Sequence, residues 1–219
     1  GANAEYVCVP AQPRMGVLAE IPDAVSWEDA AGVPVGSMTA TQLLKPDEIT
    51  PGARVLIYGA SGSVGTFAVQ LAKNAGAAVT AVSSTANIDL VAGLGADHVL
   101  DYTADTVPPA GETYDVILDA VGKAPAACKK ALRRGGRFTS VKRPTKEVPS
   151  EFERALALLA SGTMRVVTDR EYSLSQIADA HRYVESGRKR GNVVIRVGEN
   201  ESCPPSANEV SMRDVFLQE

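Results

Sequence analysis

Residues 54–76 read RVLIYGASGSVGTFAVQLAKNAG, and they place a glycine-rich turn between an apolar run and a helical pattern. Val55–Tyr58 has the length and composition of a buried strand. After the turn, apolar residues recur at helical spacing as far as Ala75, and Gly76 is well suited to end that helix. The stretch therefore predicts a strand, a tight turn and a helix in succession.

The turn itself has the pattern AxGxxG, carried by Ala60, Ser61, Gly62, Ser63, Val64 and Gly65. A dinucleotide pyrophosphate needs a close backbone approach and the positive potential of a helix N-terminus. Gly62 would permit that approach, and Gly65 would let the helix pack on the strand. A purely structural turn is the alternative. The strand before the turn and the helix after it favour a phosphate site.

Strands and helices continue to alternate after this unit. Helices are predicted at 88–94 and 124–132, a turn at Gly135-Gly136, and further strands at Ala78–Ser83, His98–Leu100, Tyr114–Val121 and Arg137–Val141. Repeated strand–helix–strand units join parallel strands by right-handed crossovers. The sequence therefore predicts an α/β fold with a doubly wound parallel sheet.

The flanking regions are less regular. On the N-terminal side we expect a short strand at Tyr6–Val9, then a helix capped by Ser26 with Asp29, interrupted over 32–36. On the C-terminal side the patterns predict a helix at 151–161, an extended segment at 166–172, a helix from the Ser173/Gln176 capping box to about 186, and a strand at 193–197. The polar, proline-broken stretch 199–219 is expected to be a mobile tail, within which VSMRDVFL could dock as a short helix.

Charge excludes some function classes. The formal net charge of −4 and the pI near 5.3 argue against a nucleic-acid partner. The basic runs 133–134 and 188–190 are interpreted as solvated helix ends or turns. No apolar run has the length of a membrane span and the N-terminus lacks a signal-peptide pattern, so we expect a soluble, cytoplasmic protein with no membrane partner.

Cysteine and histidine spacing predicts no metal site. Cys8, Cys128 and Cys203 are widely separated, and His98 and His181 are isolated. Neither a disulfide framework nor a zinc-ligand pattern is present.

The end of the second predicted strand bears on the identity of the cofactor. An NAD-binding turn is usually followed, about twenty residues later, by a carboxylate for the ribose diol. Ala81-Val82-Ser83-Ser84-Thr85 offers hydroxyls there instead, and these could bind a 2′-phosphate. This favours NADPH over NADH, and the missing acid also counts against an S-adenosylmethionine methyltransferase.

Several motifs together carry a family resemblance: the 54–85 stretch, LGADHVLDYT, YDVILDAVG, LRRGGRFTSV, the opening GANAEYVCVPA, WEDAAGVPVGSMTATQLL and REYSLSQIADAHRYVESGRKRGNVVIRV. From Gly1 to Val197 the chain resembles the medium-chain dehydrogenase/reductase superfamily, in its zinc-free quinone oxidoreductase branch. The resemblance implies a Rossmann dinucleotide-binding domain at 36–162. It also implies remnants of a GroES-like catalytic domain at both ends, with a linker, at 1–35 and 163–198, followed by the tail at 199–219.

The resemblance implies an enzyme that transfers hydride from NADPH to a quinone, an enone or a related activated alkene or carbonyl compound, which is a small-molecule substrate. It places Thr39, the candidate catalytic residue, near the nicotinamide amide and the Ala60–Gly65 turn at the pyrophosphate. The adenosine phosphate would face Ser83, Ser84 and Tyr102, and relatives often carry a Lys or Arg for it where Asn87 stands. The nicotinamide ribose would be lined by Ala120, Val121, Gly122, Ser140 and Val141. Thr39 as a helix-packing hydroxyl, Tyr102 as an ordinary loop aromatic and Asp119 as a helix cap are the structural alternatives.

The chain also departs from the family pattern. Most of the GroES-like barrel is absent, so we expect the returning segment 163–197 to have little to pair with. A strand and helices are missing after Val141, which puts the usual dimer in doubt, and Lys142 replaces a glycine beside the nicotinamide. Two hypotheses follow. One is a reductase whose cleft is open to bulky substrates or completed by a partner protein or a homo-oligomer. The other is a non-redox protein on the same fold, either a cofactor-binding module or a biosynthetic cyclase or lyase.

Overall fold

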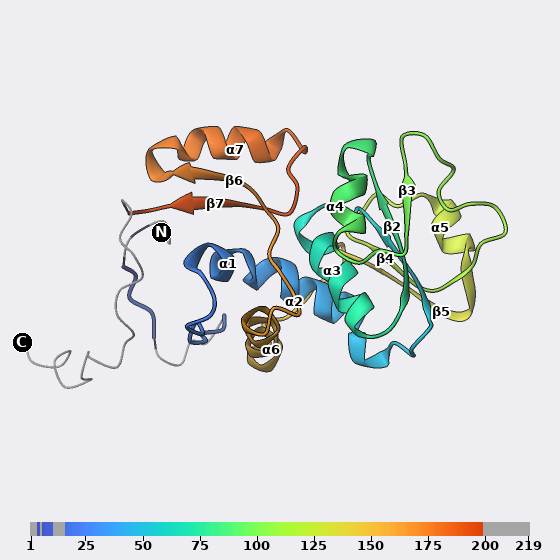
Figure 1. Cartoon of the computed structure of the whole chain (residues 1–219), viewed down its shortest axis with the longest axis horizontal. Helices are drawn as coiled ribbons and strands as arrows, with labels where there is room; N and C mark the ends of the chain where they lie inside the picture. Colours follow the sequence, from blue (N-terminus) through green and yellow to red (C-terminus); the bar gives the residue numbers. More distant parts are fainter. Residues whose placement is uncertain (1–3, 5, 11–15, 199–219) are drawn as a thin grey trace, which may run out of the picture.

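The computed structural model describes residues 4, 6–10 and 16–198 of the 219 residues and is built around a parallel sheet (Figure 1). The sheet has five strands in the order β3-β2-β1-β4-β5. Their bounds are β1 Arg54–Tyr58, β2 Ala78–Ser83, β3 His98–Asp101, β4 Tyr114–Asp119 and β5 Leu132–Ser140. In the centre, Ile57 of β1 is in register with Ala81 and Leu118 on either side. The predicted doubly wound fold is confirmed.

Alternating residues of the central strands β1, β2 and β4 enter two separate cores. On one face Val55 and Ile57 pack with α2 (Pro34–Leu44), α3 (Ser63–Asn74), α4 (Ile88–Ala92) and α6 (Pro149–Ala160). On the other face Leu56 and Ile117 pack with Cys128 of α5 (Ala126–Lys130). Helices therefore cover both faces of the sheet, as its nearly continuous apolar strands require.

The first helix before the sheet begins where the sequence predicted. Ser26 Oγ accepts the Asp29 N–H at 3.1 Å and caps α1 (Trp27–Gly32). The break predicted over residues 32–36 is too long, because Val33 alone separates α1 from α2. Pro34 is the first residue of the second helix. Gly36 lies inside α2, where a Cβ would be 2.8 Å from the Phe67 ring, so its absence allows α2 and α3 to approach closely.

The returning segment forms a second, smaller unit. It consists of β6 (Thr168–Ser173), η3 (Leu174–Gln176), α7 (Ile177–Glu185) and β7 (Asn192–Arg196), and the two strands pair in parallel. The predicted Ser173/Gln176 capping box is confirmed. The expectation that this segment would have little to pair with is wrong. β6 and β7 pair with each other, and Gly191, just before β7, forms an isolated parallel bridge with Gly62 of the glycine-rich turn.

Three other predictions of secondary structure are corrected. The segment 6–10 has no regular secondary structure, because no strand among the described residues pairs with its backbone. The helix predicted at 124–132 covers Ala126–Lys130, and β5 begins at Leu132. The Gly135-Gly136 turn lies inside β5, where the register with β4 shifts. Short 3-10 turns, η1 (Pro46–Glu48) and η2 (Thr85–Asn87), complete the described chain.

The predicted tail and its docking helix lie outside the described residues. Within the described part of the chain, none of the helices combines the length and apolar character needed to cross a membrane.

Candidate functional site

A cavity of about 720 Å³ opens at the carboxyl ends of β1 and β2, beside the loops that follow β4 and α7. Its walls come from both units of the molecule, and they are formed by Tyr58, Gly59, Ser61, Gly62, Ser83, Ser84, Ala86, Asn87, Tyr102, Val121, Lys123, Tyr183, Gly187, Arg188, Lys189 and Arg190. In doubly wound sheets ligands bind in the crevice outside the carboxyl ends of the strands. The position of this cavity follows that rule.

The glycine-rich turn supplies one wall of the cavity, and its glycines have different tasks. A Cβ on Gly65 would overlap the Gly59 carbonyl oxygen and lie 2.7 Å from Ala60 Cα, so α3 could not pack on β1. A Cβ on Gly62 would meet nothing closer than the Gly59 carbonyl oxygen at 3.6 Å. Gly62 has φ −81°, which any residue can adopt. The fold therefore requires Gly65 but leaves Gly62 open on its cavity side, as a ligand phosphate would need.

Neutral polar groups line the cavity at the end of β2. The Asn87 side-chain amide donates to Ser61 Oγ and to Ser84 Oγ, both at 3.2 Å. This pair of hydrogen bonds connects the end of β2 to the glycine-rich turn. Ser83 is buried, and its hydroxyl donates to the Ser84 carbonyl oxygen at 3.3 Å.

Two tyrosines close this part of the cavity. Tyr102, which is 53% exposed, has its ring centroid 6.4 Å from that of Tyr58 in a tilted arrangement. Burial raises the pKa of Tyr58, so its hydroxyl stays protonated at neutral pH and can donate a hydrogen bond.

The loop after β4 is held by a buried carboxylate. Asp119 accepts the backbone N–H groups of residues 121–124 at 2.8–3.2 Å, and its other bond comes from Ser140 Oγ at 3.3 Å. The interpretation of Asp119 as a cap for the next helix is wrong, because α5 begins at Ala126 after Pro125 and Asp119 holds the loop that precedes it. Gly122 has φ +78°, and a Cβ there would lie 3.0 Å from Lys142 Cε. Lys142 therefore packs over the loop at the point where the nicotinamide ribose is predicted.

The loop after α7 forms the remaining wall, and it is clamped by Asp169, whose side chain is 2% exposed. Asp169 accepts from Tyr183 Oη at 2.5 Å, from the Arg190 N–H at 2.9 Å and from Arg190 Nε at 3.2 Å. Burial opposes ionisation, but these hydrogen bonds and the Arg190 charge hold the pKa of Asp169 below its usual 3.8. The carboxylate stays ionised and fixes the loop.

The structure brings part of the predicted cofactor site into this cavity: Ser61, Gly62, Ser83, Ser84, Asn87, Tyr102 and Val121 line it. The other predicted residues adjoin it or lie apart, and they are Thr39, Ala60, Ser63, Val64, Gly65, Ala120, Gly122, Ser140 and Val141. Thr39 is half-buried in α2.

Sequence reasoning missed Tyr58, Lys123, Tyr183 and the whole loop 187–190. The basic run 188–190, interpreted from the sequence as a solvated helix end or turn, lines the cavity. The sequence signal for this wall is a run of three cations followed directly by Gly191. Gly191 forms a bridge with Gly62, which brings the cations to the glycine-rich turn.

The described residues contain no group of three His, Cys, Asp or Glu side chains that could hold a metal ion. These residues therefore do not fit a bound zinc ion.

The parallel sheet, the glycine-rich turn at its carboxyl end and the adjoining cavity define a protein with a Rossmann-type fold. The family model described as zinc-binding dehydrogenase matches residues 63–184, which is more than half of the chain. The chain belongs to this family, and its predicted membership of the medium-chain dehydrogenase/reductase superfamily, quinone oxidoreductase-like, is confirmed.

Individual relatives agree with this assignment. The chain is 30% identical to an NADPH-dependent alkenal/one oxidoreductase of Arabidopsis thaliana over 89% of its length and 53% of the relative. It is 33% identical to a 2-methylene-furan-3-one reductase of Solanum lycopersicum, over 89% of its length and 52% of the relative. A crystal structure of an NAD-dependent alcohol dehydrogenase superposes with a TM-score of 0.79 at 28% identity, covering 90% of this chain and 66% of the other. The chain thus spans about half the length of these curated relatives.

Proposed function

We propose that this protein binds NADPH at the cavity and transfers its hydride to a quinone, an enone or a related activated alkene. The observation that carries the proposal is the open Gly62 turn at the wall of a cavity large enough for a nucleotide. The similarity to an alkenal/one oxidoreductase and a furanone reductase supports this substrate class. Bound NADPH would supply the hydride, and this chain would supply its binding and orientation.

The backbone of the turn would hold the pyrophosphate. Residues of the first helical turn have N–H groups without intrahelical partners, and α3 begins at Ser63 immediately after Gly62. These donors and the helix dipole stabilise a negative charge there. The position of Gly62 allows the phosphate oxygens to come within hydrogen-bond distance of them.

The loop after β4 would orient the other half of the cofactor. Because Asp119 accepts the N–H groups of residues 121–124, it holds the loop backbone around Val121 at the edge of the cavity. A rigid edge of this kind can hold a ribose and its nicotinamide at a fixed angle. An enone that accepts hydride at carbon can take its proton from water, so the reaction needs no general acid from this chain.

The choice of cofactor rests on charge. The similar proteins differ in their cofactor, since one is an NADPH-dependent oxidoreductase and another an NAD-dependent alcohol dehydrogenase. In this chain the end of β2 presents Ser83, Ser84 and Thr85 without a carboxylate, and the described cavity lining contains basic but no acidic residues. A negatively charged 2′-phosphate is favoured by such a lining.

A second candidate is a non-redox protein that binds the nucleotide without using it. The packing of the Lys142 side chain against Gly122 favours this second candidate, because a flexible cation then occupies the edge of the cavity where the nicotinamide is expected. Under this alternative the cofactor binds and is not consumed.

A titration followed by nicotinamide fluorescence tests the proposal. The protein is expected to bind NADPH and then to oxidise it on addition of 1,4-benzoquinone or an α,β-unsaturated ketone. Absence of binding of both NADPH and NADH would refute the reductase. Binding without oxidation by any quinone or enone would favour the second candidate, and the Lys142→Gly variant would then show whether the lysine is responsible.

A further inference from the structure

The cavity is strongly basic on the side formed by the returning segment. Arg188, Lys189 and Arg190 line it from the loop between α7 and β7, and Lys123 lines it from the loop after β4. Among the described lining residues there is no Asp or Glu. Figure 1 shows the first of these loops on the side of its unit that faces α3 and α4. An anionic ligand in the cavity would therefore meet cations from a segment far from the glycine-rich turn in sequence.

The end of β2 cannot balance a phosphate monoester by itself. Such a group carries a charge of about −1.5 to −2 at neutral pH. Asn87 is uncharged, and its amide already donates to Ser61 and Ser84. Hydroxyl groups can donate to phosphate oxygens, but an anion leaving water also needs an opposite charge close by.

Two of the three cations on the loop are already engaged. Arg190 is paired with the buried Asp169, so its charge is balanced. Lys189 donates from Nζ to the Gly191 carbonyl oxygen at 2.6 Å, and burial lowers its pKa. Arg188 is exposed and has no hydrogen-bond or ion-pair partner within the described part of the chain. It is the cation of this loop whose donors are available to a ligand.

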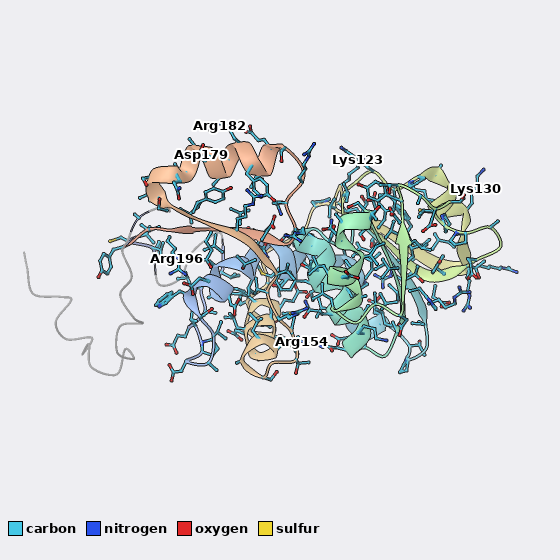
Figure 2. All side chains as sticks on the ribbon, turned by 45° about the horizontal axis from the view of Figure 1, so that its top comes forward. Lys123, Lys130, Arg154, Asp179, Arg182 and Arg196 are labelled. Carbon is cyan, nitrogen blue, oxygen red and sulfur yellow. The ribbon has the colours of Figure 1, made fainter. Side chains whose placement is uncertain are left out.

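The loop is anchored at the glycine-rich turn, beside Asn87, which follows β2. Gly191 donates its N–H to the Ser61 carbonyl oxygen at 2.8 Å, and Asn87 donates to the same serine's hydroxyl. Lys123, in contrast, follows β4, which β1 separates from β2 in the sheet. In Figure 2 Lys123 lies on the sheet side, across from α7. Arg188 therefore lines the cavity from a loop joined to the serine that Asn87 contacts, whereas Lys123 lines it from the β4 side.

We propose that Arg188 forms the ion pair with the 2′-phosphate of NADPH, and that it takes the place of the cation that position 87 lacks. The inference rests on the proposed cofactor binding and names the residue that makes it specific. The guanidinium group can donate two parallel hydrogen bonds to phosphate oxygens. NADH has a 2′-hydroxyl at that point, so its affinity does not depend on the contact.

The test compares Arg188→Ala with the wild type for binding of NADPH, NADH, adenosine 2′,5′-bisphosphate and ADP. Loss of a charge-assisted contact of this kind is expected to raise the Kd of NADPH and of adenosine 2′,5′-bisphosphate by about tenfold or more. The Kd values of NADH and ADP are expected to stay within about twofold, since neither has the 2′-phosphate that forms the ion pair. Arg188→Lys, which keeps the charge, should recover part of the loss.

Arg182→Ala is the matched control. Arg182 lies on α7 near the loop but pairs with Asp179, and Figure 2 shows it on the side of the helix away from β6 and β7. The Arg182→Ala variant should leave the Kd values of all four ligands unchanged. Equal weakening of NADPH and NADH by Arg188→Ala would mean a pyrophosphate contact and would overturn the inference. Unchanged affinities of Arg188→Ala for all four ligands would also overturn the inference. In either case, binding of NADPH by the wild type would leave the proposed function standing. A wild type that binds neither nucleotide would refute both.

Discussion

Gly191 donates its backbone N–H to the carbonyl oxygen of Ser61 at 2.8 Å. This bond joins the returning segment to the glycine-rich turn, and a second bond from Ser63 Oγ to Asn192 Oδ1 at 2.6 Å reinforces it. The two walls of the cavity are therefore built from parts of the chain far apart in sequence and are connected directly at the turn.

Replacement of Gly191 by alanine is expected to disturb this connection. Gly191 has φ +51°, and an added Cβ would overlap the Val167 carbonyl oxygen and lie 2.6 Å from Val167 Cβ. We expect a loss of about 2–3 kcal/mol in the free energy of unfolding, measured by urea denaturation, because backbone strain and a clash combine. Gly162→Ala is the control, since Gly162 has φ +70° but nothing within 4 Å of a Cβ. Equal losses in the two variants would contradict a role for the close contact.

Substitutions of Gly62 and Gly65 in the turn are expected to affect different properties, ligand binding for Gly62 and stability for Gly65. Gly62→Val should keep the thermal stability of the free protein and abolish NADPH binding, because its side chain would extend into the open cavity. Gly65→Ala should lower the free energy of unfolding by roughly 2 kcal/mol or more, since its Cβ overlaps the turn backbone. Calorimetry and fluorescence titration of both variants separate the effects. NADPH affinity that survives in Gly62→Val would show that the pyrophosphate binds elsewhere.

Removal of the Asp119 carboxylate is expected to lower the stability of the protein more than removal of an exposed carboxylate. It is 4% exposed and accepts the N–H groups of residues 121–124, so Asp119→Ala leaves several donors without a partner. A loss of about 3 kcal/mol in unfolding free energy follows from such unpaired buried groups. Asp119→Asn keeps one acceptor oxygen and should cost less. Asp47→Ala, which removes an exposed ion pair with Arg154, should have little effect.

The Asp169 clamp predicts a pH dependence of stability. Its folded pKa lies below 3.8, so the stabilisation is present above the unfolded pKa and is lost as the pH falls through the lower, folded value. The difference in unfolding free energy between the wild type and Asp169→Asn is therefore expected to be largest at neutral pH and to shrink below about pH 4. Denaturation curves from pH 7 to pH 3 measure it. A difference that is constant with pH would argue against an ionised clamp.

The sequence predicted the central sheet well because its signals are local. Short apolar strands, each followed by a turn, fix the parallel sheet whatever surrounds it, and the AxGxxG spacing identified the turn before its packing was known. The beginning of α1 was equally predictable, because the hydrogen bond that caps it joins the Asp29 N–H to Ser26 Oγ, only three residues away in the chain.

The basic loop could not be placed from sequence in the same way. The position of Arg188 depends on the pairing of β6 with β7 and on the Asp169–Arg190 contact, which join residues that no local pattern connects. Thr39 as a nicotinamide contact, the cytoplasmic location and the oligomeric state stay predictions.

The paired strands β6 and β7 have a thermodynamic consequence. Two strands alone form a marginal sheet, so this unit depends on its contacts with α1 and with the turn. Such a unit is expected to open locally at a lower free energy than the central sheet. A nucleotide bound across the cavity would add its binding energy to the closed form. Amide hydrogens of 191–196 should then exchange more slowly when NADPH is present, although most of them never touch it.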